Sequence, residues 1–321
     1  MEAEALALDL ARKIRDVAAP LLGRPDARAV AGTAVGGDPT YAIDELAELA
    51  TEEALRDLDD VAYFTEDAGL VVRGRPSELL LVDPIDGSRP ATAGFESCCV
   101  TVAVAPFRDG VTLGDVTYGC IVELPTGAAF QARKGSGAAS ELRPLIPSTK
   151  YSLDGLFWAG GFRGQPAVPL AAVLAGVFDV PGARGAFFDH GSSAYSLSRV
   201  ATGQIDAYVD PGQRIVDEVP GLEEAFRTVG GGHVLNTTTY DAAAGVLVLR
   251  EMGLPVTDAR GTPLDSVPLL RGGTTATGVS VVAAATPELH AAILAALDEG
   301  FARLRRLLEA GGEDALLGTR G

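Results

Sequence analysis

Apolar residues near the start of the chain recur at intervals of three and four, which predicts an amphipathic helix over residues 4–22. The residues on its inner face are Leu6, Leu10, Ile14, Val17 and Leu21. A second helix is predicted over 41–58. The chain then changes to short apolar runs bounded by turn residues, which predict strands at 61–66, 79–82, 98–105, 111–123 and 128–133. The first half is therefore expected to be two helices followed by a sheet.

The second half alternates between the two patterns. Strands are predicted at 156–159, 186–188, 205–209 and 279–284, and helices at 167–178, 193–202, 240–252 and 287–310. Two prolines within 143–149 indicate a connection between the halves. Helices and sheets in separate layers fit an α/β or an α+β sandwich, and we expect the α+β class. One half is expected over residues 1–148 and the other over 149–321, joined into one compact unit.

Composition narrows the function classes. The chain has 321 residues, 26 Lys plus Arg against 43 Asp plus Glu, and a net charge of -17, so nucleic acid polymers and anionic membranes are disfavoured as partners. A phosphorylated metabolite would also be repelled, unless some of the acids hold cations. Three cysteines without a C-x-x-C pair argue against a disulfide framework. An acidic start and the lack of an apolar run of about 20 residues predict a cytoplasmic protein.

One predicted strand ends in a pair of acids, in the stretch VDPIDGS that contains Asp83 and Asp86. Pro84 restricts Asp83 to extended backbone, which places its carboxylate at the end of the strand. Gly87 permits a tight turn, and Ser88 suits the N-cap of a following helix, whose free N–H groups attract anions. Two close carboxylates repel each other, and a bound Mg²⁺ with oxygen ligands would relieve that repulsion. Taken alone, the stretch is equally compatible with a turn that only closes a strand.

A nucleophilic role for Asp83 is disfavoured by the spacing of the two acids. Phosphatases of the haloacid dehalogenase type end a strand in D-x-D-G-T, and the first aspartate is their nucleophile. Acids two apart lie on the same side of an extended chain. Here three positions and a proline separate Asp83 from Asp86.

Three further acids lie where they could join this pair. Glu66 ends the strand that precedes Asp83, so neighbouring strands could bring the two side by side. Asp44 lies in the first turn of its helix, and Asp241 begins a helix of small residues. Each acid by itself is more simply explained as a turn or helix-start residue.

Together these pieces resemble the inositol monophosphatase family, within the superfamily that includes fructose-1,6-bisphosphatases. The stretch VDPIDGS is similar to the family's D-P-x-D-G-T signature, and FTED to its acidic segment. The other matching stretches follow in the family's order: GDPTYAIDELAE before them, then GSSAYSLSRVATGQIDAYVD and YDAAAGVLVLREMGLPVTDARGTPLD. The resemblance implies the layered α-β-α-β-α sandwich and a homodimer.

The resemblance also implies a Mg²⁺-dependent phosphomonoesterase acting on a small phosphorylated polyol, sugar or nucleotide, such as an inositol phosphate or fructose 1,6-bisphosphate. Two or three Mg²⁺ would be bound by Glu66, Asp83, the backbone carbonyl of Ile85, Asp86 and Asp241. Asp44, Glu66 and Ser88 would serve catalysis, with Asp44 and Ser88 positioning the attacking water. The phosphate would be held by backbone N–H groups of Gly87 and Ser88, and the alcohol portion by Gly191, Ser192, Ser193 and Asp210.

The sequence departs from the family pattern most clearly after Asp210. The 31 positions from Asp210 to Asp241 are more than family members usually have, and the insertion 211–238 is expected to add a helix over about 219–228. Asp217 is an alternative to Asp241 as the late metal ligand, although Asp241 has the family's spacing to the segments that follow. Arg214 and His233 could contact substrate, but as lone residues they fit surface or turn positions better.

A second hypothesis is a metal- or sugar-phosphate-binding protein with impaired catalysis. Ser88, where the family usually has threonine, and the long insertion motivate it. The presence of every acidic ligand in the motif argues for the enzyme.

Overall fold

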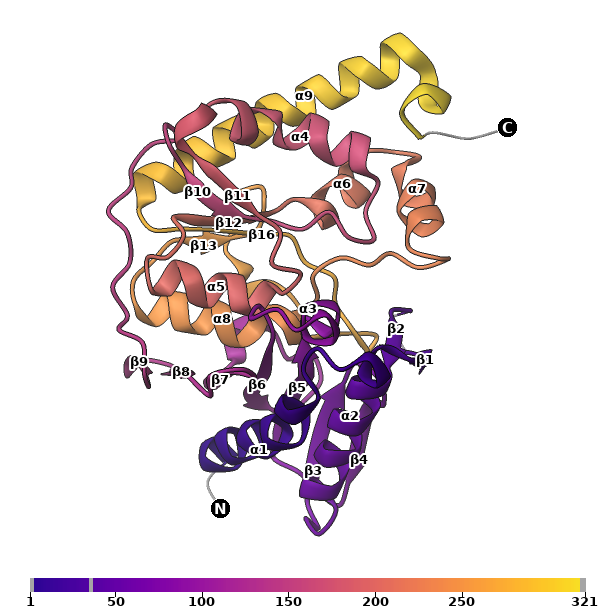
Figure 1. Cartoon of the computed structure of the whole chain (residues 1–321), viewed down its shortest axis with the longest axis vertical. Coiled ribbons are helices and arrows are strands. Elements are labelled where there is room, and N and C mark those ends of the chain that lie inside the picture. Colours follow the sequence, from indigo (N-terminus) through magenta and orange to yellow (C-terminus); the bar gives the residue numbers. More distant parts are fainter. Residues whose placement is uncertain (1–2, 35–36, 318–321) are drawn as a thin grey trace.

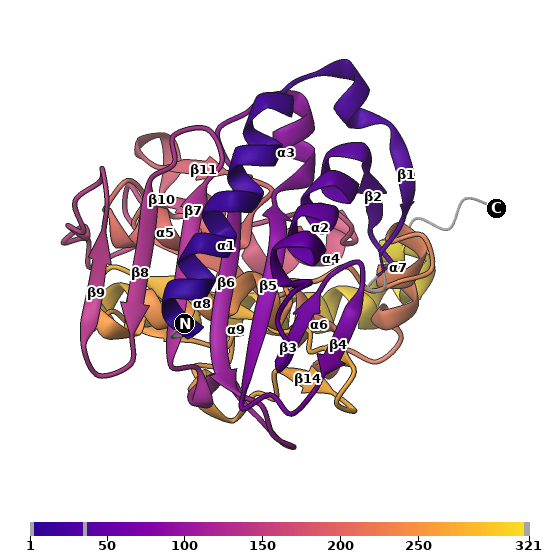
Figure 2. The same cartoon turned by 90° about the horizontal axis from the view of Figure 1, so that it is seen from below.

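Five layers of helices and sheets stack through the molecule (Figure 1). The computed structural model describes residues 3–34 and 37–317. Helices α1 (Ala3–Ala18) and α2 (Ala42–Leu55) cover the outer face of a seven-stranded sheet, as Figure 2 shows from below. Helices α5 (Ser193–Ala201) and α8 (Thr239–Glu251) lie between the two sheets. Helices α4 (Ala167–Asp179) and α9 (Pro287–Leu317) cover the outer face of a five-stranded sheet.

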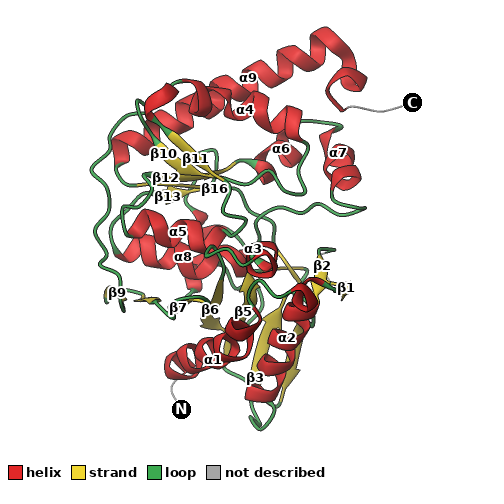
Figure 3. Cartoon of the chain, in the orientation of Figure 1, coloured by secondary structure: helices red, strands yellow, loops and turns green. Residues whose placement is uncertain are grey.

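The alternation of helical and strand layers is clear in Figure 3. It confirms the predicted α-β-α-β-α sandwich, an α+β fold. The division of the chain at residues 148 and 149 stays a prediction.

The larger sheet has the strand order β4-β3-β5-β6-β7-β8-β9. Strands β3 and β5 are parallel, and every other neighbouring pair in this sheet is antiparallel. Its strands are β3 (Val61–Thr65), β4 (Gly69–Arg73), β5 (Glu78–Asp86), β6 (Cys99–Pro106), β7 (Tyr118–Glu123), β8 (Ala129–Arg133) and β9 (Gly137–Ser140).

The smaller sheet has the strand order β11-β10-β12-β16-β13, with β10 parallel to both of its neighbours. Its strands are β10 (Phe157–Ala159), β11 (Ala186–Phe188), β12 (Ala207–Asp210), β13 (Val256–Thr257) and β16 (Val281–Ala284). Two short hairpins flank the sheets: β1 (Val30–Thr33) with β2 (Pro39–Tyr41), and β14 (Leu270–Arg271) with β15 (Thr275–Ala276).

Strand β5 is buried on both of its faces. Leu79 and Leu81 pack into the core between the two sheets, whereas Leu80 and Val82 pack into the core beneath α1 and α2. Successive side chains of a strand point to opposite faces, so a strand between two cores is apolar at every position. This explains the unbroken apolar run that ends in Asp83.

The structure corrects several predicted boundaries. The strand predicted at 111–123 is confined to β7, and a 3-10 helix, Leu113–Asp115, precedes it with Thr112 as its N-cap. Helix α2 ends at Leu55 rather than Leu58. The edge strands β4 and β9 were not predicted, because half-exposed edges carry little apolar alternation.

The insertion holds two helices rather than the single predicted one. They are α6 (Gly212–Glu218) and α7 (Leu222–Val229). Pro220 disfavours helical backbone at the preceding Val219, and Gly221 adopts a left-handed φ of 85°. The break between the helices therefore follows from the local sequence.

Candidate active site

Asp83 and Asp86 reach the same cavity because β5 is irregular between them. Residues three apart on a regular strand point to opposite faces. Along the antiparallel ladder with β6, Asp83 pairs with Thr101 and Asp86 pairs with Cys99, so three steps on β5 match two on β6. This is a β-bulge, and it holds Pro84, a residue that sheets tolerate at bulges. The bulge redirects one of the two carboxylates.

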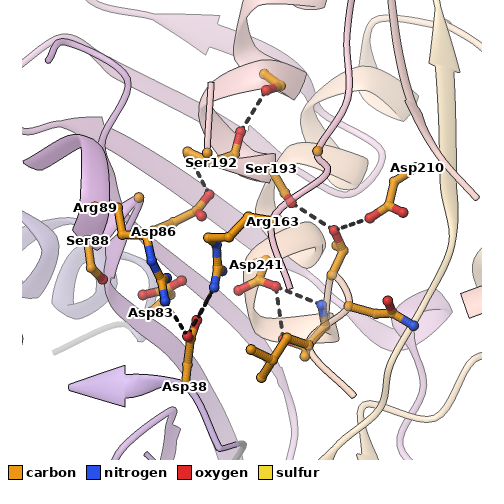
Figure 4. Close-up of a pocket in the computed structure, with 18 of the residues that line it drawn as sticks. Asp38, Asp83, Asp86, Ser88, Arg89, Arg163, Ser192, Ser193, Asp210 and Asp241 are labelled. Atoms are coloured by element: carbon orange, nitrogen blue, oxygen red, sulfur yellow. Dashed lines mark hydrogen bonds and ion pairs between the residues drawn. The ribbon is translucent and has the colours of Figure 1, made fainter. Parts of the chain in front are cut away.

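Asp241 completes a compact cluster with this pair. Carboxylate oxygens of Asp83, Asp86 and Asp241 all lie within 4.8 Å of one another (Figure 4). Asp241 belongs to the first turn of α8, where its Oδ2 accepts a 2.7 Å hydrogen bond from the backbone N–H of Thr238. The helix start thus fixes the direction of this carboxylate.

Glu66 lines the same cavity from the end of β3. Phe64 pairs with Leu81 in the parallel ladder, which places Glu66, two residues later, level with Asp83. Burial raises the pKa of Glu66 and of Asp83 well above the usual carboxyl range, and repulsion from neighbouring carboxylates raises both further. Burial also raises the pKa of Asp86 to about 6 and that of Asp241 to about 7. Burying several ionised carboxylates close together is unfavourable in free energy unless bound cations neutralise their charge.

Asp86 is oriented by the start of α5, more than a hundred residues away in the sequence. Ser192, the N-cap of α5, donates a 2.7 Å hydrogen bond from its hydroxyl to Asp86 Oδ2, and the backbone N–H of Ala194 donates to the same oxygen at 2.6 Å. These hydrogen bonds and the helix dipole favour the ionised carboxylate, which opposes the effect of burial.

Gly87 forms the turn that follows the acid pair. Its φ is +98°, and a Cβ there would lie 2.6 Å from the carbonyl oxygen of Ser97. Gly87 is the N-cap of the short helix α3 (Ser88–Ala93), so the predicted N-cap role of Ser88 is wrong. Ser88 is the first helical residue instead, and its hydroxyl donates to the carbonyl oxygen of Ile85 at 3.2 Å.

Asp44 lies behind the cavity wall rather than on it. Its Oδ2 accepts a 2.8 Å hydrogen bond from the backbone N–H of Tyr41, at the start of α2, and its buried Oδ1 has no hydrogen-bond partner among the described residues. Burial raises its pKa to about 7, and the nearby Ser88 hydroxyl works in the opposite direction. Ser88 therefore stands between Asp44 and the cavity.

The four residues predicted to contact the alcohol portion all line the cavity: Gly191, Ser192, Ser193 and Asp210. The side chains of the two serines and of Asp210 are already hydrogen-bonded to the protein. Ser193 Oγ lies 2.9 Å from both the Tyr208 hydroxyl and Thr237 Oγ1, and Thr237 donates to Asp210 Oδ2 at 2.6 Å.

Sequence analysis missed a group of charged residues at the cavity. Arg163, in the loop between β10 and α4, pairs with Asp38 at 2.8 Å, and Arg89 of α3 pairs with the same carboxylate at 3.1 Å. Figure 4 shows the Arg163 side chain crossing the cavity toward Asp38. Asp38 lies at the start of the stretch GDPTYAIDELAE, whose resemblance to the family assigns it no role, and Arg163 lies in no motif.

The structure places the alternative candidates from the insertion elsewhere. Asp217 on α6 pairs with Arg260 at 3.2 Å and accepts a 2.8 Å hydrogen bond from Gln213, so it lies outside the carboxylate cluster. Arg214 is buried, pairs with Glu218 and Asp298, and lies over the ring of Phe301. Its role is packing between α6 and α9.

Comparison with known proteins agrees with the family resemblance of the sequence motifs that form this site. The sequence pattern of the Inositol monophosphatase family matches residues 2–301. The chain belongs to this family. As a member it is a phosphatase, an enzyme of the phosphoric monoester hydrolase class.

Curated relatives from archaea and bacteria match most of this inositol monophosphatase family chain. A protein of Methanothermobacter thermautotrophicus named fructose-1,6-bisphosphatase/inositol-1-monophosphatase is 28% identical over 91% of this chain and 95% of its own length. The Nus factor SuhB of Xylella fastidiosa is 27% identical over 68% of each chain.

Solved structures share the fold of this family member. The extragenic suppressor protein SuhB of Bartonella henselae superposes with a TM-score of 0.71 and 20% identity, covering 94% of this chain and all of its own. Within the described part of the chain, no helix combines the length and the apolar character that crossing a bilayer requires.

Proposed function

We propose that this enzyme hydrolyses the phosphomonoester of a small phosphorylated polyol, sugar or nucleotide in a Mg²⁺-dependent reaction. The observation that carries the proposal is the compact cluster of Asp83, Asp86 and Asp241, whose oxygens lie within 4.8 Å of one another beside the Gly87 turn. An acidic protein can accept a phosphate at such a place only if cations neutralise the carboxylates.

The donor set fits Mg²⁺. All candidate ligands are hard oxygen atoms: carboxylates of Glu66, Asp83, Asp86 and Asp241, and the carbonyl of Ile85, which lines the cavity in the bulge. These residues would hold two or three ions. When bound, Mg²⁺ supplies a water of lowered pKa and neutralises charge that develops on the leaving oxygen.

The residues around the cluster would then orient the reactants. Ser88 and, behind it, Asp44 would hold the attacking water, since Asp44 Oδ1, which no described residue contacts by a hydrogen bond, offers an acceptor next to the Ser88 hydroxyl. Backbone N–H groups of Gly87 and Ser88 would hold the phosphate. Ser192 and Ala194 keep Asp86 ionised and directed at the cluster.

Phosphate release from a panel of esters tests the proposal. Inositol 1-phosphate, fructose 1,6-bisphosphate, 3′-phosphoadenosine 5′-phosphate and several sugar phosphates should be assayed with Mg²⁺ and with excess EDTA. We expect turnover that EDTA abolishes and that Asp241→Asn lowers by about 100-fold or more. Asp265→Asn is the matched control, because Asp265 is exposed, pairs with Arg250 at 3.2 Å and lies outside both the cluster and the cavity over it. Turnover that survives EDTA, or Mg²⁺ and ester binding without turnover, would contradict the proposal.

We further propose that the chain forms a homodimer. Phe157 and Phe188 support this, because both aromatic side chains are substantially exposed on adjacent strands, β10 and β11, the latter at the edge of its sheet. Light scattering after gel filtration measures the state directly, and a monomer across micromolar concentrations would contradict it. A cytoplasmic location and the absence of a nucleic acid partner stay predictions.

A further inference from the structure

The ion pair between Asp38 and Arg163 lies at the entrance of the cavity over the carboxylate cluster. Both residues line this cavity. Their side chains are 18% and 39% exposed, whereas Asp83 on the cavity floor is only 2% exposed. The pair is therefore nearer to solvent than the cluster, and Figure 4 shows Arg163 reaching over the cavity to Asp38. We call this contact the entrance ion pair.

Arg163 also lies close to the acids beneath it. Burial lowers the pKa of its guanidinium, but the negative charges around it outweigh this effect and raise the pKa. The largest of these charges is that of Asp38, and Glu66 and Asp241 of the site add to it. The entrance ion pair is thus within electrostatic reach of the cluster.

Asp38 is held from two segments that are far apart in the sequence. Arg89 of α3 donates to Asp38 Oδ1 at 3.1 Å, and its guanidinium lies over the ring of Tyr41, 5.7 Å from the centroid. Arg163 Nη1 donates to both carboxylate oxygens of Asp38, at 3.0 and 2.8 Å. The carboxylate therefore ties the loop after β10 to α3.

The insertion packs against the neighbours of both partners in this pair. A Cβ at Gly37, which precedes the aspartate, would lie 2.0 Å from His233 Cγ. A Cβ at Gly164, which follows the arginine, would lie 2.8 Å from Leu235 Cβ. Two side chains of the insertion thus fill the space over these glycines. The insertion supports the entrance ion pair at both of its ends.

The alcohol portion of a substrate would have to lie at this entrance. The cavity has a volume of about 130 Å³, and ions and a phosphoryl group at the cluster would occupy much of it. An alcohol that extends toward solvent then meets the entrance ion pair and Leu235, which also lines the cavity. A small alcohol fits beside the pair. A large one requires the pair to separate, and breaking charge-assisted hydrogen bonds costs free energy.

We propose that the entrance ion pair, supported by the insertion, selects substrates by the size of their alcohol portion, so that the enzyme prefers small polyols and compact sugars to nucleosides. Asp38 and Arg163 determine this specificity, and His233 is a positioning residue that acts through the segment of Asp38. The inference rests on the proposed phosphatase function and narrows its substrate class.

Two monoesters of equal charge and different size test the inference: glycerol 2-phosphate and adenosine 2′-phosphate. We expect the wild type to have the higher kcat/KM for the glycerol ester, and Asp38→Asn to reduce that preference about five-fold by raising activity toward the nucleotide. Arg163→Gln should give the same shift, and the double variant no more than either single one, because all three remove one contact. Asp154→Asn is the matched control, since Asp154 forms an exposed ion pair with Arg184 at 2.6 Å, outside the cavity.

His233→Ala separates support by the insertion from direct contact with substrate. His233 is not among the described residues that line the cavity, so the loss of its ring acts on the size preference through Gly37 and Asp38. We expect a shift in the same direction as in Asp38→Asn. His233→Phe retains a ring over Gly37 and should keep the wild-type preference. An unchanged preference in His233→Ala would overturn the role assigned to the insertion.

The outcomes separate this inference from the proposed function. A size preference that is the same in the wild type, Asp38→Asn and Arg163→Gln would overturn the inference while the phosphatase function stands. An equal loss of kcat/KM for both esters in Arg163→Gln would also overturn it, because that result assigns Arg163 to the phosphate. If no ester is hydrolysed, the proposed function fails. Calorimetric binding of the two esters to the wild type and to Asp38→Asn, with Mg²⁺ present, then decides the inference by the same comparison.

Discussion

The hydroxyl of Ser192 donates a 2.7 Å hydrogen bond to Asp86 Oδ2, which joins the start of α5 to the acid pair of β5. The same hydroxyl oxygen accepts a 3.1 Å hydrogen bond from the backbone N–H of Tyr195 as the N-cap of the helix. One side chain therefore stabilises α5 and directs a candidate metal ligand. A defect at this position should affect folding and metal affinity together.

Replacing Ser192 by alanine tests this double role. We expect Ser192→Ala to lower the free energy of unfolding by about 1–2 kcal/mol through the lost cap, and to weaken Mg²⁺ affinity by roughly ten-fold. Chemical denaturation and Mg²⁺ titration of activity measure the two effects. Ser192→Thr keeps the hydroxyl and should retain most of both. Unchanged Mg²⁺ affinity in the alanine variant would show that Asp86 does not depend on Ser192.

The Ser88 hydroxyl is predicted to matter more for turnover than for binding. It lies between the Ile85 carbonyl and the buried Asp44, where it would position the attacking water. We expect Ser88→Ala to lower kcat by roughly 100-fold with little change in KM, and Ser88→Thr to keep activity near that of the wild type. Steady-state kinetics with saturating Mg²⁺ gives both constants. A loss confined to KM would point instead to phosphate binding.

Stability of the metal-free protein should fall as the pH rises from about 4 to about 7. Burial raises the pKa of Asp44, Glu48 and Asp241 to about 7 and that of Asp86 to about 6, whereas unfolded carboxyls titrate near 4. Between these values the folded state binds more protons than the unfolded state, so the free energy of unfolding decreases with pH.

Mg²⁺ should therefore stabilise the protein more at pH 8 than at pH 5.5, because at the lower pH it must displace bound protons. Thermal unfolding at both pH values, with Mg²⁺ and with EDTA, measures the difference. Asp241→Asn should reduce both the pH slope and the Mg²⁺ effect. An equal gain in Tm from Mg²⁺ at the two pH values would be evidence against a cluster that exchanges protons for metal.

A side chain at Gly87 should damage the site. Its φ of +98° is strained for alanine, and the added Cβ would press on the Ser97 carbonyl. We expect Gly87→Ala to cost about 2–4 kcal/mol of stability and most of the activity. Gly110→Ala is the matched control: its φ is +67°, but nothing lies within 4 Å of the added Cβ, so about 1 kcal/mol is expected. Equal losses in the two variants would show that the close approach to Ser97 is unimportant.

Much of the fold, and most of the candidate acidic residues, could be predicted because they depend on local patterns in the sequence. The spacing of Leu6, Leu10 and Ile14 is enough to predict α1, and an apolar run that ends at Asp83-Pro84 predicts a buried strand with acids at its end. The order of the motifs indicated the family, and with it the layers.

What the sequence could not show depends on contacts between distant residues. The bulge that directs both Asp83 and Asp86 toward one cavity is defined by the pairing register of β5 with β6. The ion pair of Arg163 with Asp38 joins residues that are 125 positions apart in the sequence. No periodicity encodes either, since both arise from the packing of separate segments.

The sequence by itself thus determined most element types and the layered α+β fold, and it predicted a set of candidate acids, because these follow from hydrophobic period, turn residues and ordered motifs. Only the tertiary structure decided that Asp241 and not Asp217 joins the cluster, and that the insertion packs against the neighbours of Asp38 and Arg163. The reason is physical: side chains converge through the docking of α8, the insertion and the loop after β10, and the direction of each depends on neighbours far away in the chain.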